Sequence, residues 1–137
     1  MLTGVAIICA SLATGVVTAK DKPASPELFP LEASVVQRTN AERARYGMRP
    51  LAVDRNLLQS ARNHAAWMTR ARVMQHTNQA VAENIAMGQP SSAHVMQSWM
   101  NSPGHRANIL NPGYTRIGVA AYQTQEGTIF WCQQFLH

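Results

Sequence analysis

Two long segments of the chain carry apolar residues at every third or fourth position, which is the spacing of an amphipathic helix. The first segment predicts a helix over residues 31–46 that ends before Gly47. The second follows Asp54, whose carboxylate suits an N-cap, and predicts a helix running to about Arg72. Its apolar stripe consists of Leu57, Leu58, Ala61, Ala65 and Met68.

Two shorter helices are predicted further along the chain. Ser91 or Ser92 can cap a third helix. Ser102 can cap a fourth, with Pro103 at the first helical position, where its missing N–H is harmless. The fourth helix would hold His105 in its first turn, close to the free N–H groups.

After Pro112 apolar residues recur at every second position, which is the spacing of a half-buried strand. Apolar residues alternate with polar or smaller ones over residues 117–121 and again over residues 129–135. Glu126-Gly127 lies between the two runs as a turn. This pattern predicts an antiparallel hairpin. Helices first and paired strands last indicate an α+β layered domain rather than a parallel sheet.

The N-terminal segment differs from the rest. Residues 1–19 contain no charged side chain, and their apolar run is too short to span a bilayer comfortably. The run ends in Val17-Thr18-Ala19, which a signal peptidase could cut, so we expect an exported protein with a signal peptide at 1–19. An uncleaved anchor and a mis-assigned start codon are the alternatives. Residues 20–30 hold three prolines and are interpreted as a linker, with the folded domain at 31–137.

Charge and cysteine content restrict the classes of function. The formal net charge is +5, and eight of the ten arginines fall between Arg38 and Arg72. Aromatic residues do not alternate with these arginines in the way that a nucleic-acid platform needs, so we do not expect nucleic acid as a partner. Of the two cysteines, Cys9 would leave with the signal peptide, and Cys132 lies in a predicted strand, where burial is expected. The fold therefore does not depend on a disulfide framework.

His76, Glu83 and His105 are the candidates for chemistry, because each lies in or beside a predicted loop or helix start. Two imidazoles and one carboxylate could hold a divalent metal ion, with zinc the natural occupant. None of these residues shows the i, i+4 spacing of a zinc-protease helix. The alternative is a buried polar network in which Glu83 orients its neighbours. For His64, inside the second helix, we expect packing or hydrogen bonding.

Nucleophilic catalysis finds little support in the chain. Cys132 lies between aromatic and polar strand residues, far in sequence from the histidines, which does not favour a thiolate. Ser102 is better explained as a helix cap. The chain has neither a Gly-x-Ser-x-Gly elbow nor a phosphate-binding glycine loop.

A series of motifs from Asn40 to Val119 resembles the CAP superfamily (cysteine-rich secretory proteins, antigen 5 and pathogenesis-related 1), and most closely its short bacterial secreted branch. The likeness covers nearly all of residues 31–135, and its most specific block is residues 99–110. In chain order the motifs are Asn40-x-x-Arg43-x-x-x-Gly47, Leu51-x-x-Asp54-x-x-Leu57-x-x-x-Ala61, His76-Thr77, Glu83-Asn84-Ile85-Ala86-x-Gly88, Trp99-Met100-Asn101-Ser102-Pro103-Gly104-His105-Arg106-x-Asn108-Ile109-Leu110 and Tyr114-Thr115-x-Ile117-Gly118-Val119.

This resemblance implies an α-β-α sandwich with a small antiparallel sheet between helical layers. It also implies a surface cleft around a His-Glu-Glu-His tetrad, in which His76 and Glu83 match the first His and the first Glu. Ser102 stands where the second Glu is usual, and Gly113 where animal members carry the second His. The bacterial pattern offers His105 instead, and Asn84 is included among the expected cleft residues.

From the resemblance we expect a secreted, monomeric, non-enzymatic binding module with an extracellular or envelope ligand. Its cleft would hold a divalent metal or a small ligand. One alternative is a metal-assisted hydrolase acting on a peptide or cell-envelope substrate. In that enzyme His76 and His105 would hold the metal, and Glu83 would act as ligand or general base. A second alternative is lipid capture between helices.

Overall fold

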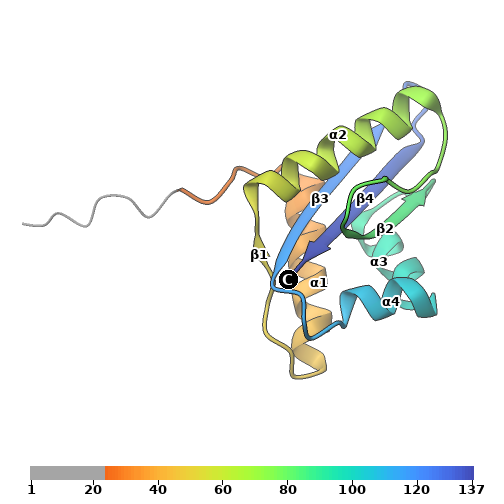
Figure 1. Cartoon of the computed structure of the whole chain (residues 1–137). Coiled ribbons are helices and arrows are strands. Elements are labelled where there is room, and N and C mark those ends of the chain that lie inside the picture. The colour runs from red at the N-terminus through yellow and green to blue at the C-terminus, as the bar shows by residue number, and fades with distance from the viewer. Residues whose placement is uncertain (1–23) are drawn as a thin grey trace, which may run out of the picture.

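The computed structural model describes residues 24–137, so the predicted signal peptide at 1–19 lies outside the described residues. Figure 1 shows the path of the chain. In order, the elements are α1 (Pro30–Arg45), β1 (Ala52–Val53), α2 (Arg55–Ala71), β2 (Ala82–Met87), α3 (Ser92–Met100), α4 (Pro103–Ile109), β3 (Arg116–Gln123) and β4 (Ile129–Leu136).

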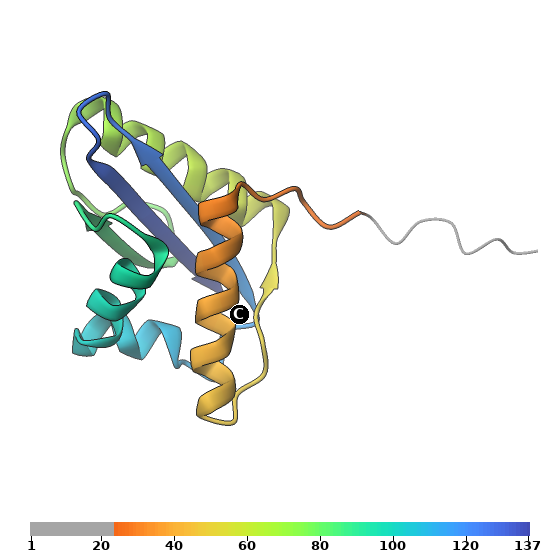
Figure 2. The same ribbon diagram turned by 180° about the vertical axis from the view of Figure 1, so that it is seen from behind.

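The elements form three layers, which confirms the expected α-β-α sandwich. The central sheet has the strand order β1-β3-β4-β2. Helix α2 covers one face of it, as Figure 1 shows, and α1, α3 and α4 lie on the other face, which Figure 2 brings to the front. None of the helices in residues 24–137 is long and apolar enough to cross a membrane.

The sheet is mixed rather than purely antiparallel. Strands β3 and β4 form the predicted hairpin, and β2 pairs antiparallel with the other side of β4. Strand β1, however, runs parallel to β3 and contains only two residues. Two residues are too few for a period of two to be recognised in the sequence, which is why this strand was not expected.

Local sequence signals explain where the helices begin. The Asp54 carboxylate accepts a hydrogen bond from the Leu57 N–H at 2.8 Å, so Asp54 caps α2 as predicted. Ser91 caps α3 by accepting from the His94 N–H at 3.3 Å. Ser102 occupies the N-cap position of α4 but makes no capping hydrogen bond through its side chain. Pro103 follows it at the first helical position, as expected.

Alternation along β4 divides the core into two parts. Trp131 and Phe135 pack with the α1, α3 and α4 layer, whereas Phe130 and Cys132 pack beneath α2. Cys132 is fully buried, as predicted. The same alternation places two buried glutamines, Gln133 and Gln134, on opposite faces of the sheet.

Helix α2 approaches the sheet very closely at Gly118 of β3. A Cβ atom on Gly118 would lie 2.3 Å from the carbonyl oxygen of Leu57. The glycine therefore allows the helix backbone to lie against the strand backbone. This contact fixes the height of α2, and of the side chains it carries, above the sheet.

Candidate functional site

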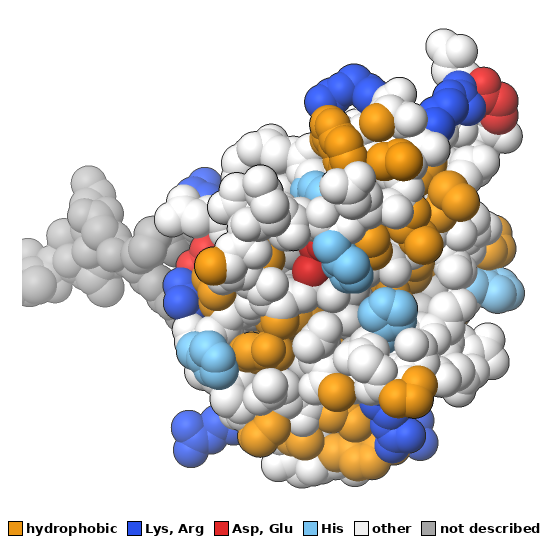
Figure 3. All heavy atoms as spheres, turned by 45° about the vertical axis from the view of Figure 1, so that its right-hand side comes forward, with side chains coloured by type: hydrophobic (Ala, Val, Ile, Leu, Met, Phe, Trp, Pro, Cys, Tyr) orange, Lys and Arg blue, Asp and Glu red, His pale blue; other side chains and the backbone are white. Residues whose placement is uncertain are grey.

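The candidate site is centred on Glu83, the second residue of β2. Its register partner on β4 is Gln134, and the side chains of both point to the face that α2 covers. Glu83 is 8% exposed, so its carboxylate lies between the sheet and the segment that follows α2. Figure 3 shows pale-blue histidine side chains around a small acidic surface on this side of the molecule.

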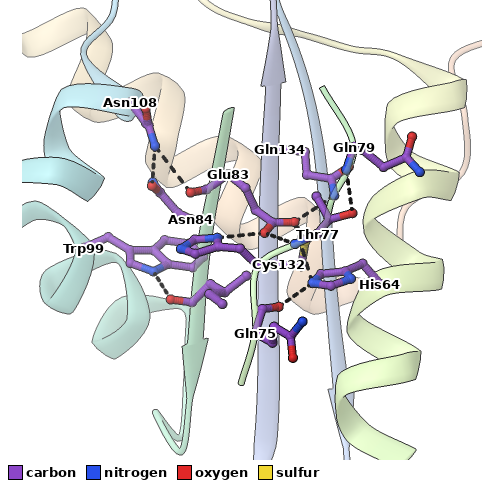
Figure 4. Close-up of polar contacts among 12 residues, drawn as sticks. His64, Gln75, Thr77, Gln79, Glu83, Asn84, Trp99, Asn108, Cys132 and Gln134 are labelled. Carbon is purple, nitrogen blue, oxygen red and sulfur yellow. Dashed lines mark hydrogen bonds and ion pairs between the residues drawn. The ribbon is translucent and has the colours of Figure 1, made fainter. Parts of the chain in front are cut away.

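The Glu83 carboxylate has partners on both oxygens (Figure 4). Oε1 accepts from His76 Nδ1 at 2.8 Å and from the Thr77 N–H at 2.9 Å. Oε2 accepts from Gln134 Nε2 at 2.9 Å and lies 3.5 Å from the Cys132 thiol. A carboxylate accepts about four hydrogen bonds. The acceptor capacity of Glu83 is thus largely used inside the protein.

These contacts determine the ionisation of the buried pair. Burial by itself raises the pKa of Glu83, but the hydrogen bonds from Gln134, the Thr77 N–H and His76 outweigh burial and lower that pKa below 4.5. Burial raises the pKa of the Cys132 thiol well above its ordinary value, and the nearby Glu83 charge raises it further. Glu83 is therefore ionised at neutral pH, while Cys132 stays a protonated thiol.

His76 is held in one tautomer by this arrangement. An ionised carboxylate can only accept hydrogen bonds. Nδ1 of His76 therefore carries the hydrogen atom and donates it to the hydrogen bond with Glu83. In the neutral ring, Nε2 is then the nitrogen with a free lone pair, as in histidines that ligate metals. The His76 side chain is 61% exposed, so the ring is anchored at one end and open to solvent at the other.

His105 is brought to the same region from the opposite layer. It lies in the first turn of α4, as expected, and its backbone carbonyl accepts from the Asn84 side chain at 3.1 Å. Burial lowers the pKa of His105 below 6.5, and the charge of nearby His76 lowers it further. His105 is therefore available as a neutral imidazole at neutral pH.

Asn84 supports the site rather than lining it. Its side chain is fully buried and points away from Glu83, because neighbouring strand residues face opposite sides of the sheet. Besides His105 it contacts Gln133 at 3.0 Å and Asn108 at 2.9 Å, so it ties α4 to β2 and β4. For Ser102, no side-chain hydrogen bond to these residues is present in the described part of the chain.

Two contributors to the site were missed from the sequence. His64 on α2 donates a hydrogen bond from Nε2 to the Gln75 carbonyl at 2.7 Å, in agreement with the hydrogen-bonding role expected for it. The same nitrogen also lies 3.8 Å from Glu83 Oε2, which was not expected. Gln134 supplies a direct hydrogen bond to the carboxylate. The signal for Gln134 was the pair Gln133-Gln134 in an otherwise apolar strand, since buried amides require partners.

A complete metal-binding set is not formed by protein side chains alone. Within residues 24–137, no three His, Cys, Asp or Glu side chains are grouped so that they could hold a metal ion together. The donors that remain for a cation are the imidazoles of His76 and His105, with Glu83 orienting His76 from behind.

The fold and the arrangement of these residues define a member of the cysteine-rich secretory protein family, CAP. Residues 36–135 match this family, and the chain belongs to it.

Individual relatives agree with this assignment. The chain is 37% identical to YkwD of Bacillus subtilis (strain 168) over 136 residues, covering 87% of this chain and 51% of YkwD. It therefore spans about half the length of that relative. An extracellular protein of Bacillus anthracis with an SCP domain superposes with a TM-score of 0.70 at 26% identity, covering 82% of this chain and 45% of that protein. The structure of NaASP2 with Zn²⁺ has the same fold, with a TM-score of 0.65 at 13% identity over 82% of each chain.

Proposed function

We propose that this chain is an extracellular binding module that takes up a divalent cation such as zinc at His76 and His105. We call these two histidines and Glu83 the histidine site. The observation that carries the proposal is the 2.8 Å hydrogen bond between Glu83 and His76 Nδ1, which makes Nε2 the ring nitrogen that is free to ligate a cation. Carboxylate–histidine pairs of this kind orient metal ligands and raise their basicity.

The location and the ligand class have separate support. The B. anthracis structure with the same fold is an extracellular protein, which agrees with the export signal expected at 1–19. The low pKa of His105 keeps its imidazole neutral and able to ligate. Two imidazoles are fewer than the three protein ligands of a usual catalytic zinc site, so we expect reversible binding of micromolar strength.

The arrangement of Glu83 favours binding over hydrolysis. A general base needs a free oxygen within reach of the water it activates. Both oxygens of Glu83 already accept hydrogen bonds from groups that hold His76 and the adjoining chain in place. Glu83 is therefore better suited to positioning His76 than to removing a proton from water.

Calorimetric titration with zinc tests the proposal. We expect the domain to bind zinc, and both His76→Ala and His105→Ala to lose at least about tenfold in affinity. Glu83→Gln should weaken binding by roughly 10–100-fold because the orienting carboxylate is lost. His94→Ala is the matched control, since His94 is an exposed histidine on α3. Zinc binding that is absent in the wild type, or unchanged in His76→Ala, contradicts the proposal.

A further inference from the structure

A second hollow, separate from the histidine site in its chemistry, lies along the exposed face of α2. Its volume is about 500 Å³, which is within the range of about 300–1,000 Å³ typical of small-ligand sites. The residues from α2 recur every three or four positions from Asn56 to Trp67, so they form one stripe along the helix. Thr77 and Gln79, from the segment after α2, line the opposite side. We call this hollow the amide groove.

Trp67 provides a flat apolar surface within the groove. It is 40% exposed, whereas the other two tryptophans, Trp99 and Trp131, are buried. Its ring stacks on His64, with centroids 5.6 Å apart and planes inclined by 20°. His64 is itself fixed by its 2.7 Å hydrogen bond to the Gln75 carbonyl. The tryptophan is therefore supported in one orientation before any ligand arrives, which lowers the entropic cost of binding.

Apart from His64, the polar side chains of the groove are groups that carry no charge. Four of its side chains are amides and two are hydroxyls, and no Arg, Lys, Asp or Glu is among the lining residues. This is unusual for a chain of net charge +5 whose helix α2 carries Arg55, Arg62 and Arg70. A phosphate-bearing or carboxylate-bearing ligand would require compensating charge at the site. The groove is therefore complementary to a neutral polar ligand.

The amide side chains place hydrogen-bond donors next to hydrogen-bond acceptors. Gln59 Nε2 donates to Asn63 Oδ1 at 2.9 Å, which orients both groups. The Gln59 carbonyl and the Asn63 NH₂ keep hydrogen-bonding capacity for a ligand. Gln79 lies beside Thr77 on the opposite side of the groove (Figure 4). Neighbouring donors and acceptors of this kind match the neighbouring hydroxyl groups of a sugar ring.

We propose that the amide groove binds a neutral oligosaccharide. One pyranose ring stacks its C–H face on Trp67, and the hydroxyls of the chain bond to Gln59, Asn63 and Gln79. A smaller hollow of about 240 Å³ shares His64, Trp67 and Thr77 with the groove and extends to His76. The sugar chain thus lies next to the histidine site, but its binding requires no cation there.

Tryptophan fluorescence and calorimetry test the proposal with two defined probes, the tetramer of N-acetylglucosamine and cellotetraose. Because Trp99 and Trp131 are buried, a ligand in the groove should change the emission of Trp67 selectively. We expect at least one probe to bind in the micromolar-to-millimolar range. Trp67→Ala and Asn63→Ala should each weaken binding by about tenfold or more.

Matched variants test whether the sugar binds in the amide groove and nowhere else on the domain. Tyr46→Ala removes an exposed aromatic residue from another part of the surface, and Gln37→Ala removes an exposed amide from α1; neither should alter binding. Sugar binding should also be the same in the presence of EDTA as in the presence of zinc, so a failure of zinc binding and a failure of sugar binding are distinguishable. Thermal melts verify that Trp67→Ala folds, and Asn63→Ala tests the groove without altering the aromatic ring. Absence of binding for both probes, or unchanged binding in Trp67→Ala and Asn63→Ala, overturns the proposal.

Discussion

Glu83 illustrates how one buried residue links the sheet to the segment that carries His76. The carboxylate accepts hydrogen bonds from Gln134, from the Thr77 N–H and from His76, and these contacts keep it ionised in spite of burial. Charge-assisted hydrogen bonds are stronger than neutral ones. The position of His76 therefore depends on the charge of a residue seven positions away in the sequence.

This dependence gives the stability of the domain a defined response to acid. The folded pKa of Glu83 is below 4.5, so the unfolded chain binds more protons as the pH falls through this region. The contribution of Glu83 is therefore complete above about pH 4.5 and is lost as the pH falls through the lower folded pKa. We expect Glu83→Gln to reduce the free energy of unfolding by about 1–3 kcal/mol at pH 7.

Urea unfolding between pH 7 and pH 3 measures this response. The difference between wild type and Glu83→Gln should shrink as the pH falls. Glu27→Gln, which changes an exposed carboxylate, should follow the wild type throughout. A difference that stays constant with pH would show that ionised Glu83 does not stabilise the fold.

At the scale of elements, the contact between α2 and β3 depends on Gly118. A Cβ there would meet the backbone of Leu57 at 2.3 Å, and backbone atoms cannot move aside as a flexible side chain can. Helix α2 would have to move away from the sheet, which disturbs the packing of Ala61 and Ala65 against it.

We therefore expect Gly118→Ala to lower the free energy of unfolding by about 1–3 kcal/mol or more. Gly104→Ala is the matched control, because nothing lies within 4 Å of the added atom and the residue is in α4. Alanine there should leave stability unchanged or raise it by up to about 1 kcal/mol. Chemical denaturation of the two variants side by side measures the effect, and equal stabilities would contradict a requirement for glycine at this contact.

Elements differ in how far they could be predicted from the sequence. The four helices and the hairpin follow from local signals, such as the cap at Asp54 and the alternation after Pro112. Strand β2 was not predicted, because Ala82–Met87 mixes polar and small residues with only two large apolar ones, and its partner β4 lies more than forty residues away. No local pattern specifies such a pairing.

The same limit applies to the candidate site. His76, Glu83 and His105 could be named from residue type and position, and the family resemblance supplied the same residues. The hydrogen bond from Gln134 could not be foreseen, because it depends on the register that places Gln134 opposite Glu83. The closeness of His64 required the orientation of α2 above the sheet.

At the scale of the whole molecule, Arg43 joins segments that are distant in the sequence. The residue is 1% exposed. Its guanidinium donates to the carbonyls of Arg49, Ile109, Asn111 and Tyr114, at 2.9, 2.9, 2.8 and 3.4 Å respectively. These acceptors lie in the connection after α1, at the end of α4 and just before β3. One side chain therefore links the C-terminal part of α1 to the end of α4 and to the segment before β3.

Loss of this side chain should unfold the domain more readily than loss of an exposed arginine. Arg43→Ala leaves up to four carbonyls without a donor and should cost about 3 kcal/mol or more. Arg43→Lys should recover only part of this, since an ammonium group cannot reproduce the planar set of donors. Arg45→Ala on the same helix removes an exposed pair with Glu42 and should cost less than about 1 kcal/mol. Equal losses in thermal or urea unfolding for Arg43→Ala and Arg45→Ala would contradict this role.

The buried thiol of Cys132 has a practical consequence for labelling the protein. Reagents such as maleimides react with thiolates, and Cys132 is fully buried next to the Glu83 carboxylate, which keeps it protonated. Within residues 24–137 it is the only cysteine. In a protein of residues 24–137, a cysteine introduced on the surface would therefore be modified while Cys132 stays unmodified, as long as the domain is folded. Dyes can be attached at chosen points of this part of the chain without first removing Cys132.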